Sequence, residues 1–332
     1  MSRSNQVILS IEGLATSFET DDDRVNVLDS ISFELNRGES LGLVGESGCG
    51  KSVTALAIMR LLPKPSGRID AGKIIYNGQD LLSLSIQQMH HIRGKKIAMI
   101  FQEPMTALNP VQRIGAQLGE VYRIHFPEMS EEQSRAEQLE MLKKVGIPAP
   151  EKRLREYPHQ LSGGMRQRVM IAMALSCKPD ILIADEPTTA LDVTTQNQIL
   201  GLMRELQQDT NMATIFITHD LGVIAEMCDR VIVMYAGRIA EQAPVKELFR
   251  KPGHPYTRGL LESIPKLDTT PKTELKVIEG MVPGLKDIPK GCRFRTRCDF
   301  GQDICSVADP QLEPVSADNS HQVACVRWRD IG

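Results

Sequence analysis

The stretch Gly45-Glu46-Ser47-Gly48-Cys49-Gly50-Lys51-Ser52 fits the pattern G-x-x-x-x-G-K-[ST]. It follows an apolar run at 41–44 that is typical of a strand, and it precedes a run from Val53 to Met59 that is typical of a helix. Glycines let the backbone curl so that successive N–H groups point at phosphate oxygens, and the start of a helix adds the positive end of its dipole. This context predicts a phosphate-binding loop running into Val53, with Lys51 reaching the outer phosphates and Ser52 ligating Mg²⁺.

Composition and charge limit the class of protein. The 332 residues are 41% hydrophobic and 24% charged, which is ordinary for a soluble globular chain of about two domains. A net charge of −3 provides no global field that favours nucleic acid or an anionic membrane. No apolar run approaches the ~18 residues of a membrane span, and residues 1–6 lack the apolar segment of a signal peptide. We therefore expect a cytoplasmic protein that reaches a membrane only through a partner subunit.

Further apolar or alternating runs predict strands. They lie at 7–11, 31–35, 73–79, 96–101, 181–186, 213–220, 230–235 and 238–241. Two of these runs end in polar residues, one in Asp185 and Glu186 and the other in a stretch that contains His219. The carboxyl-terminal edges of parallel strands are where ligands bind. Carboxylates at such an edge, beside a phosphate loop, suit Mg²⁺ ligation and water activation.

Three other features have alternative interpretations. The polar region at about 114–146 predicts a helical insert, and Ser130 and Gln133 fit a capping box within it. The pair Gly163-Gly164, capped by Ser162, opens another helix; it is either a plain helix start or a place where free N–H groups meet an anion. Phe18, at the end of the first strand, is either a core aromatic residue or a ring stacked on adenine.

Six motifs in this order resemble those of the nucleotide-binding subunits of ABC transporters, over residues 6 to 250. They are the Walker A loop at 45–52, the Q-loop Gln102, the signature 161–165, Walker B ending at Asp185 with Glu186 beside it, the D-loop 189–192 and the switch His219. The signature departs from the commoner form because Met165 replaces glutamine. The resemblance implies an α/β fold: an ABC-type P-loop nucleotide-binding domain with a helical subdomain and a small loop-rich C-terminal extension.

The C-terminal part narrows this resemblance. Segments at 254–257, 264–265, 280–283, 291–294 and 297–298 look like the C-terminal extension of oligopeptide and dipeptide importers, and so does 101–110 around the Q-loop. We expect an ATPase domain at 1–250, with a helical insert at about 112–165, and a Cys-containing extension of the peptide-importer type at 251–332. The D-type ATPase of that group resembles this chain most, and it usually pairs with a distinct F-type ATPase.

The resemblance also implies a reaction, which is ATP hydrolysis coupled to import of dipeptides or oligopeptides. Two ATPase chains pair head to tail, so that one phosphate loop faces Ser162, Gly163 and Gly164 of the other across the γ-phosphate. The implied roles are Glu186 as general base, Asp185, Ser52 and Gln102 as Mg²⁺ ligands, His219 on the γ-phosphate and Asp192 at the dimer seam. The bound species are thus ATP and Mg²⁺.

The implied partners are a second, F-type ATPase, two membrane permease subunits and an extracytoplasmic substrate-binding protein, with the chain at the cytoplasmic face of the membrane. The sequence leaves the cargo open, because nickel, cell-wall peptides and oligosaccharides are carried by related importers. A rival interpretation is a soluble nucleic-acid-linked ABC ATPase, although the net charge argues against it. It is suggested by a basic patch interleaved with Phe294: Lys290, Arg293, Arg295 and Arg297. A non-enzymatic regulatory domain is another rival, and it is disfavoured by the intact motif residues Lys51, Asp185, Glu186 and His219.

Four of the seven cysteines form a separate group near the end of the chain. Cys292, Cys298, Cys305 and Cys325 follow C-x5-C-x6-C-x19-C, which matches neither zinc ribbons nor the bacterial ferredoxin run. Four free thiols are one interpretation, and disulfides are disfavoured in a reducing compartment. Four thiolates also suit Zn²⁺ or an iron–sulfur cluster. The resemblance to importer ATPases that carry such a cluster favours [4Fe–4S], with zinc as the alternative, to fold the tail and steady the paired ATPases.

Overall fold

The computed structural model describes residues 6–21, 23–102, 107–188, 192–264 and 277–331. The chain divides into two compact units. The helical unit comprises Met1–Gln6, Asn36–Gly38 and Ser83–Ile215, and the sheet unit comprises Val7–Leu35, Glu39–Leu82 and Phe216–Gly332. Within the described ranges, no helix is both long enough and apolar enough to cross a membrane.

The first sheet of the sheet unit has the strand order β2-β1-β4-β5. Its strands are β1 (Val7–Glu19), β2 (Arg24–Asn36), β4 (Gly67–Tyr76) and β5 (Gln79–Asp80). β1 and β4 run antiparallel, from the pair Leu9 and Tyr76 to the pair Phe18 and Gly67. The predicted runs at 7–11 and 31–35 lie inside β1 and β2, but both strands extend to 13 residues, and β1 stays paired with β4 as far as Phe18.

The second sheet places the phosphate loop. In the sheet unit its order is β11-β12-β10-β9-β3. The strands are β3 (Ser40–Val44), β9 (Arg230–Tyr235), β10 (Arg238–Pro244), β11 (Glu313–Pro314) and β12 (Gln322–Val323). β3 is buried along its whole length and runs parallel to β9. The predicted hairpin is confirmed, because β9 and β10 pair antiparallel around Ala236 and Gly237, which both have positive φ.

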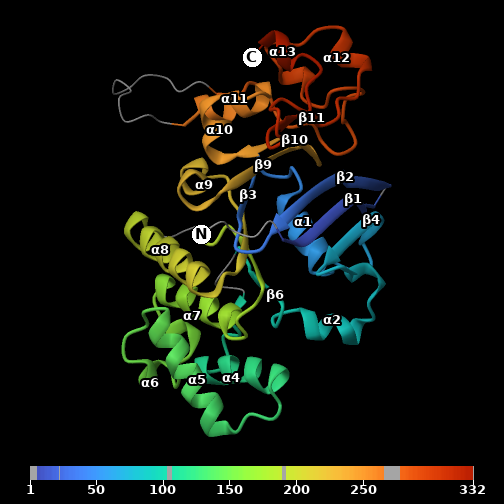
Figure 1. The fold of residues 1–332 in the computed structure, drawn as a ribbon. Helices are drawn as coiled ribbons and strands as arrows, with labels where there is room; N and C mark the ends of the chain where they lie inside the picture. The colour runs from blue at the N-terminus through green and yellow to red at the C-terminus, as the bar shows by residue number, and fades with distance from the viewer. Residues whose placement is uncertain (1–5, 22, 103–106, 189–191, 265–276, 332) are drawn as a thin grey trace. The chain divides into compact units, whose positions relative to one another are not determined.

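The helices of the sheet unit are short. They are α1 (Lys51–Ile58), α9 (Leu221–Met227), α10 (Val245–Arg250), α11 (Pro255–Glu262), α12 (Ile304–Val307) and α13 (Trp328–Ile331), with 3-10 turns η1 (Leu81–Ser83, at the unit's edge) and η3 (Arg295–Arg297). The predicted helices after the phosphate loop and at 257–264 are thus confirmed as α1 and α11. The C-terminal tail, which we define as residues 277–331, has no longer element among its described residues than a four-residue helix (Figure 1).

The helical unit contains three neighbouring strands and most of the long helices. The strands are β6 (Ile97–Ile100), β7 (Ile181–Asp185) and the start of β8 (Ala213–Ile217), in the order β6-β7-β8. The helices are α2 (Ile86–Ile92), α4 (Ile114–His125), α5 (Glu131–Lys144), α6 (Pro150–Arg153), α7 (Gly163–Leu175) and α8 (Val193–Thr210), with the 3-10 turn η2 (Pro158–Gln160). Helices α4 to α7 gather at one end of this unit (Figure 1).

Local capping signals explain several of these helix starts. The predicted capping box is confirmed: Ser130 accepts from the Gln133 N–H, and the Gln133 side chain accepts from the Ser130 N–H. The predicted cap Ser162 is confirmed as well, accepting from the Met165 N–H at 3.3 Å. A second capping box, Ser85 with Gln88, starts α2. The same S-x-x-Q signal is present in the sequence there, so α2 could have been found by the same rule.

Candidate functional site

The phosphate loop connects the buried strand β3 to α1. Its glycines permit the curl, because Gly45, Gly48 and Gly50 have φ values of 147°, 80° and 106°. A Cβ on Gly45 would lie 2.2 Å from the Met234 carbonyl oxygen of β9, so only glycine fits there. The loop tip, Ser47 and Gly48, is exposed. The sequence-predicted loop is therefore present at a strand–helix junction with its apex open to a ligand.

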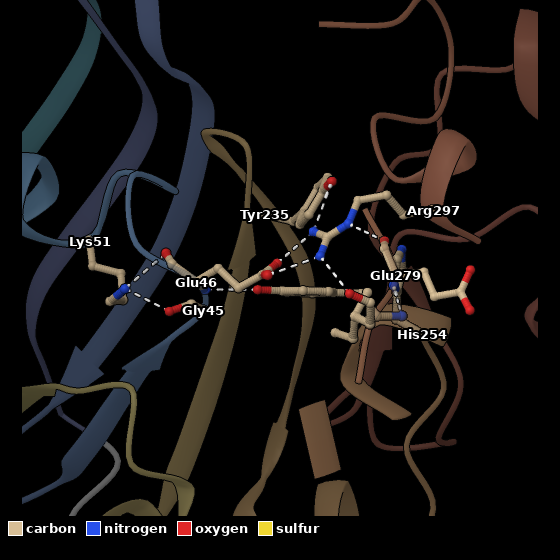
Figure 2. A network of polar contacts seen from close by, with 9 residues as sticks. Gly45, Glu46, Lys51, Tyr235, His254, Glu279 and Arg297 are labelled. Carbon is tan, nitrogen blue, oxygen red and sulfur yellow. Dashed lines mark hydrogen bonds and ion pairs between the residues drawn. The ribbon is translucent and has the colours of Figure 1, made fainter. Parts of the chain in front are cut away.

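Lys51 is folded back onto this loop. Its ammonium donates to the carbonyl oxygens of Gly45 at 2.7 Å and Glu46 at 3.1 Å, and the residue is only 7% exposed (Figure 2). Burial raises the pKa of the neighbouring Cys49, which keeps its thiol neutral near pH 7. Ser52 is half-buried in the first turn of α1, and Val53 follows it there. The ammonium group of Lys51 is thus held by backbone carbonyl oxygens of the loop itself.

The helical unit joins two of the predicted site residues directly. Gln102, just after β6, donates from its side-chain amide to Glu186 Oε2 at 2.9 Å. Asp185, the last residue of β7, is buried at 4% exposure. Glu186 has a φ of 46°, a left-handed conformation that is uncommon outside glycine and that concentrates at functional sites. The end of β7 therefore presents one buried carboxylate and one that an amide holds in place.

The signature residues lie at the exposed start of α7. Ser162 and Gly163 are exposed, and Gly164 packs against α8, where an added Cβ would lie 2.9 Å from the Thr195 methyl group. Asp192 caps α8 by accepting from the Thr195 N–H at 2.9 Å, and this bond lowers the pKa of Asp192. Both helix starts in this unit therefore leave side chains of predicted site residues at the surface.

Two more predicted residues belong to the sheet unit. His219 is exposed between β8 and α9, in a turn where the Asp220 N–H donates to Thr218 Oγ1 at 3.0 Å. Phe18 is half-buried at the end of β1, opposite Gly67, where an added Cβ would lie 2.9 Å from the Phe18 ring. The predictions at 103–106 of the Q-loop stretch and at 189–191 of the D-loop lie outside the described residues.

The four tail cysteines converge without forming a recognisable metal site. Cys292, Cys298, Cys305 and Cys325 line one cavity of about 20 Å³, room for about one water molecule. All seven cysteines are free thiols. Burial raises the pKa of Cys298 to about 11. In the described parts of the chain, no group of three or more His, Cys, Asp or Glu residues is arranged to hold a metal ion. The donor chemistry suits a metal, the arrangement does not support one, and the cluster stays a prediction.

Sequence reasoning missed a set of residues that touch the phosphate loop from the C-terminal part of the chain. Tyr256 accepts a hydrogen bond from the Glu46 N–H at 2.8 Å, and Arg297 pairs with the Glu46 carboxylate (Figure 2). These partners are 210 and 251 positions from Glu46 in the sequence. No local pattern signals a contact over that separation.

Comparisons with known proteins agree with this geometry. The sequence profile of the family described as "ABC transporter" matches residues 28–189, and that of "Oligopeptide/dipeptide transporter, C-terminal region" matches residues 240–305. The chain is similar to the dipeptide transport ATP-binding protein DppD of Bacillus subtilis, with 52% identity over 96% of this chain and 94% of that one. It is also similar to the oligopeptide transport ATP-binding protein OppD of Salmonella typhimurium, with 49% identity over 92% and 90%.

A solved structure shares the fold. It is described as the dimeric, post-hydrolysis state of an ATP-binding cassette bound to ADP and phosphate; the TM-score is 0.64 at 26% identity, over 71% of this chain and 98% of that chain. These matches confirm the α/β, ABC-type fold class that the motifs implied. The chain has a phosphate loop after β3 and a signature at the start of α7, and it is about 50% identical to its relatives over nearly its whole length. It therefore belongs to the family of ABC transporter ATP-binding subunits.

Proposed function

We propose that this chain is the ATP-hydrolysing subunit that powers import of dipeptides or oligopeptides through a membrane ABC transporter. The observation that carries the proposal is the intact phosphate loop, with Lys51 seated on it, in a chain similar along its length to peptide-transport ATPases. The C-terminal profile match, at residues 240–305, supports peptides over nickel or oligosaccharides as cargo.

ATP binding is assigned to the loop 45–52. The exposed apex and the start of α1 supply N–H groups and the positive end of a helix dipole to the phosphates. Lys51 exchanges the carbonyl oxygens of Gly45 and Glu46 for phosphate oxygens, so its charge, already desolvated, is not stripped of water again. The ring of Phe18 is assigned to adenine stacking, with the alternative that it only packs over Gly67.

Water activation is assigned to Glu186. A carboxylate held by the Gln102 amide keeps one orientation, as a general base must. Asp185, Ser52 and Gln102 are assigned to Mg²⁺, directly or through water, since Mg²⁺ prefers oxygen donors and usually keeps several waters beside the phosphates. Mg²⁺, when bound, neutralises charge on the phosphates. His219, exposed at the end of β8, is assigned to the γ-phosphate.

Pairing with a second ATPase is assigned to the exposed start of α7. Ser162, Gly163 and Gly164 would meet the γ-phosphate held by the partner, and Asp192 would lie at the seam. Support comes from the exposure of Ser162 and Gly163, and from the dimeric state described for the similar cassette structure. One phosphate loop and one signature per chain mean that a partner is needed to complete a site. We assign that partner to a distinct, F-type chain.

The remaining assembly follows from the peptide-transport relatives. Two permease subunits would hold the chain at the cytoplasmic face of the membrane, and an extracytoplasmic binding protein would deliver peptide. The ATPase domain would span 1–250, with its helical insert at about 112–165, and the extension 251–332. The placement of the two family profiles, at 28–189 and 240–305, supports this division.

Metal binding by the four tail cysteines is the least supported part of the proposal. A four-thiolate [4Fe–4S] cluster, with Zn²⁺ as the alternative, would fold the tail, and no step of the reaction is assigned to it. The support is the chemistry of four thiols that line one cavity, and not their arrangement. Anaerobic purification with iron, sulfide and zinc analysis, for the wild type and Cys298→Ser, tests it. Stoichiometric zinc without iron contradicts the cluster, and the absence of both metals contradicts any metal role.

The main proposal is tested by reconstitution with candidate permease, second ATPase and binding-protein subunits in vesicles. We expect ATP hydrolysis that rises when peptide-loaded binding protein is added, and that Lys51→Ala abolishes. Stimulation by nickel or oligosaccharide binding proteins, but not by peptide-loaded ones, would contradict the peptide assignment. Recovery of an active complex with two identical copies of this chain would contradict the F-type partner.

A further inference from the structure

The side chain of Glu46, the second residue of the phosphate loop, is held by the C-terminal tail. Arg297 donates to Glu46 Oε2 at 2.7 Å and to Oε1 at 3.0 Å, a bidentate pair (Figure 2). The Arg297 side chain is 4% exposed and that of Glu46 is 31% exposed. The hydrogen bond to Glu46 raises the pKa of Arg297, so the guanidinium stays charged. This ion pair is therefore largely shielded from water on the arginine side.

Arg297 is itself fixed by the tail. Its Nε donates to the Glu279 carbonyl oxygen at 3.0 Å, and Nη2 donates to that of Ile278 at 3.3 Å. Cys298, the next residue, lines the cysteine cavity. A guanidinium held by two backbone oxygens loses little further freedom when it grips a carboxylate. Arg297 thus links the segment that carries Cys298 to the phosphate loop through a guanidinium group that backbone oxygens already hold in place.

The backbone of Glu46 is held by the same part of the chain. Its N–H donates to the hydroxyl of Tyr256, which is fully buried in α11. The Tyr256 ring packs with Tyr235 at 4.7 Å and Phe294 at 5.4 Å between centroids, and Tyr235 and Phe294 lie 5.2 Å apart. Tyr235 ends β9, and Phe294 precedes η3. Packing within this aromatic cluster fixes the position of the Tyr256 hydroxyl, which accepts the hydrogen bond from the Glu46 N–H.

The charge on Glu46 matters because the loop binds a polyanion. An unpaired carboxylate on the loop would repel the phosphates, and a loop free to move would cost entropy when ATP binds. The bidentate pair removes the repulsion, and the two contacts together fix the first turn of the loop. Lys51 contacts the same turn, because its ammonium donates to the Glu46 carbonyl oxygen.

We propose that Arg297 and Tyr256 are positioning residues of the nucleotide site: the C-terminal tail neutralises Glu46 and holds the phosphate loop ready for ATP. The inference rests on the proposed ATPase function and deepens it, since it makes the extension part of the ATP site.

The test is equilibrium binding of ATP with Mg²⁺ to the full chain. Arg297→Gln should weaken binding by up to about 10²-fold, the scale of a misplaced binding group. Glu46→Gln combined with Arg297→Gln should recover most of that loss, because the unpaired carboxylate is gone. Arg297→Lys, which keeps the charge and loses the fork, should fall between. In the reconstituted complex, KM should rise while kcat at saturating ATP stays unchanged.

The matched control is Arg295→Gln, which removes an arginine from the same turn, η3, where Arg295 lines the cysteine cavity. It should bind ATP like the wild type. A purely structural role predicts instead a lower melting temperature with unchanged ATP affinity in Arg297→Gln, and that result overturns the inference. If Arg297→Gln does not fold, Arg297→Lys with wild-type affinity overturns it equally. Failure of the wild type to bind ATP would overturn the proposed function instead.

Discussion

Strand β3 and the C-terminal tail belong to the same sheet unit and are held in opposite ways. All five residues of β3 are buried, and its backbone pairs in register with β9 from Leu41 to Val44. The described part of the tail has four-residue helices and two-residue strands, one of which pairs with β10, and side-chain ion pairs add to this short backbone attachment. Arg293 pairs with Asp29, and His321 with the fully buried Glu241.

Because β3 and the tail are held in different ways, substitutions near them should affect different properties of the protein. The support of β3 is spread over backbone hydrogen bonds and apolar burial, so replacing one side chain at a neighbouring strand end leaves the strand in place. The tail concentrates its support in a few charged groups, and removing one partner of a buried pair leaves an uncompensated charge. We therefore expect site variants in the strand-edge motifs to change rates, and variants at tail pairs that do not touch the phosphate loop, such as Glu241 with His321, to change stability.

The largest expected effect is on catalysis. Glu186→Gln should lower kcat about 10²–10⁴-fold while ATP binding is retained, because the proposed general base is lost and the amide can still pair with Gln102. The unfolding midpoint should stay near that of the wild type. Single-turnover hydrolysis and thermal unfolding measure the two quantities. Near wild-type turnover would show that another group activates the water.

The opposite case is Glu241 in β10. Its carboxylate accepts from the Gly253 N–H at 2.7 Å, from the His254 N–H at 2.9 Å and pairs with His321 at 2.7 Å. Glu241→Ala strands these buried partners and should cost about 3–5 kcal/mol of unfolding free energy. Urea unfolding followed by hydrogen exchange of the tail measures the loss and its location.

Glu247→Ala is the control for that variant. Glu247 Oε2 lies 4.0 Å from the other ring nitrogen of the same His321, but its side chain is 51% exposed. A solvent-exposed pair contributes about 0–1 kcal/mol. Equal costs for the two carboxylates would show that burial is not what makes the tail dependent on Glu241.

The next effect is a dependence of stability on pH. Burial lowers the pKa of His254 to about 4, from an ordinary 6.5, and its Nδ1 accepts from the Tyr256 N–H. The unfolded chain binds this proton first, so stability is full above pH 6.5 and falls as the pH drops toward 4, by up to about 3 kcal/mol. His254→Asn, which retains a capping acceptor, should flatten the part of the wild-type curve that lies in this window.

Protonation of Glu241 acts in the same direction at lower pH. Burial alone would raise its pKa, but the bonds from His321 and from the Gly253 and His254 N–H groups outweigh burial and lower the pKa. Its contribution is lost as the pH falls through that lowered value. An unchanged slope between pH 6.5 and 4 in His254→Asn would assign the whole dependence to other groups.

The smallest expected effect concerns Phe18, which serves either ATP binding or packing of the first sheet. Phe18→Ala should weaken ATP binding by roughly 1–3 kcal/mol if the ring stacks on adenine. If the ring only packs over Gly67, ATP affinity should be unchanged and the unfolding midpoint should fall. Calorimetric titration and thermal unfolding of the same preparation distinguish the two roles.

Local signals predicted much of the fold and several local features of the candidate site. The phosphate loop, the Ser130 capping box, the Ser162 cap and the turn at Ala236-Gly237 each depend on residues a few positions apart, so they are readable in sequence. The contacts of Glu46 with Tyr256 and Arg297 are not. An ion pair between distant residues has no period or spacing, and many arginines could serve. The motifs indicated where the candidate site lies, but they did not indicate the long-range contacts of Tyr256 and Arg297 with its phosphate loop.

The separation between Glu46 and Arg297 also has a consequence for how the protein is made. The phosphate loop leaves the ribosome early, whereas Arg297 is added 251 residues later. At about 5–20 residues per second, that interval is about 13–50 s. During it, the nascent chain carries a loop whose acidic side chain has not yet met its basic partner. A chain cut short before Arg297 would retain the nucleotide motifs and lack the ion pair with Glu46, so that, if Arg297 positions the loop, translation past Arg297 is a condition for tight ATP binding.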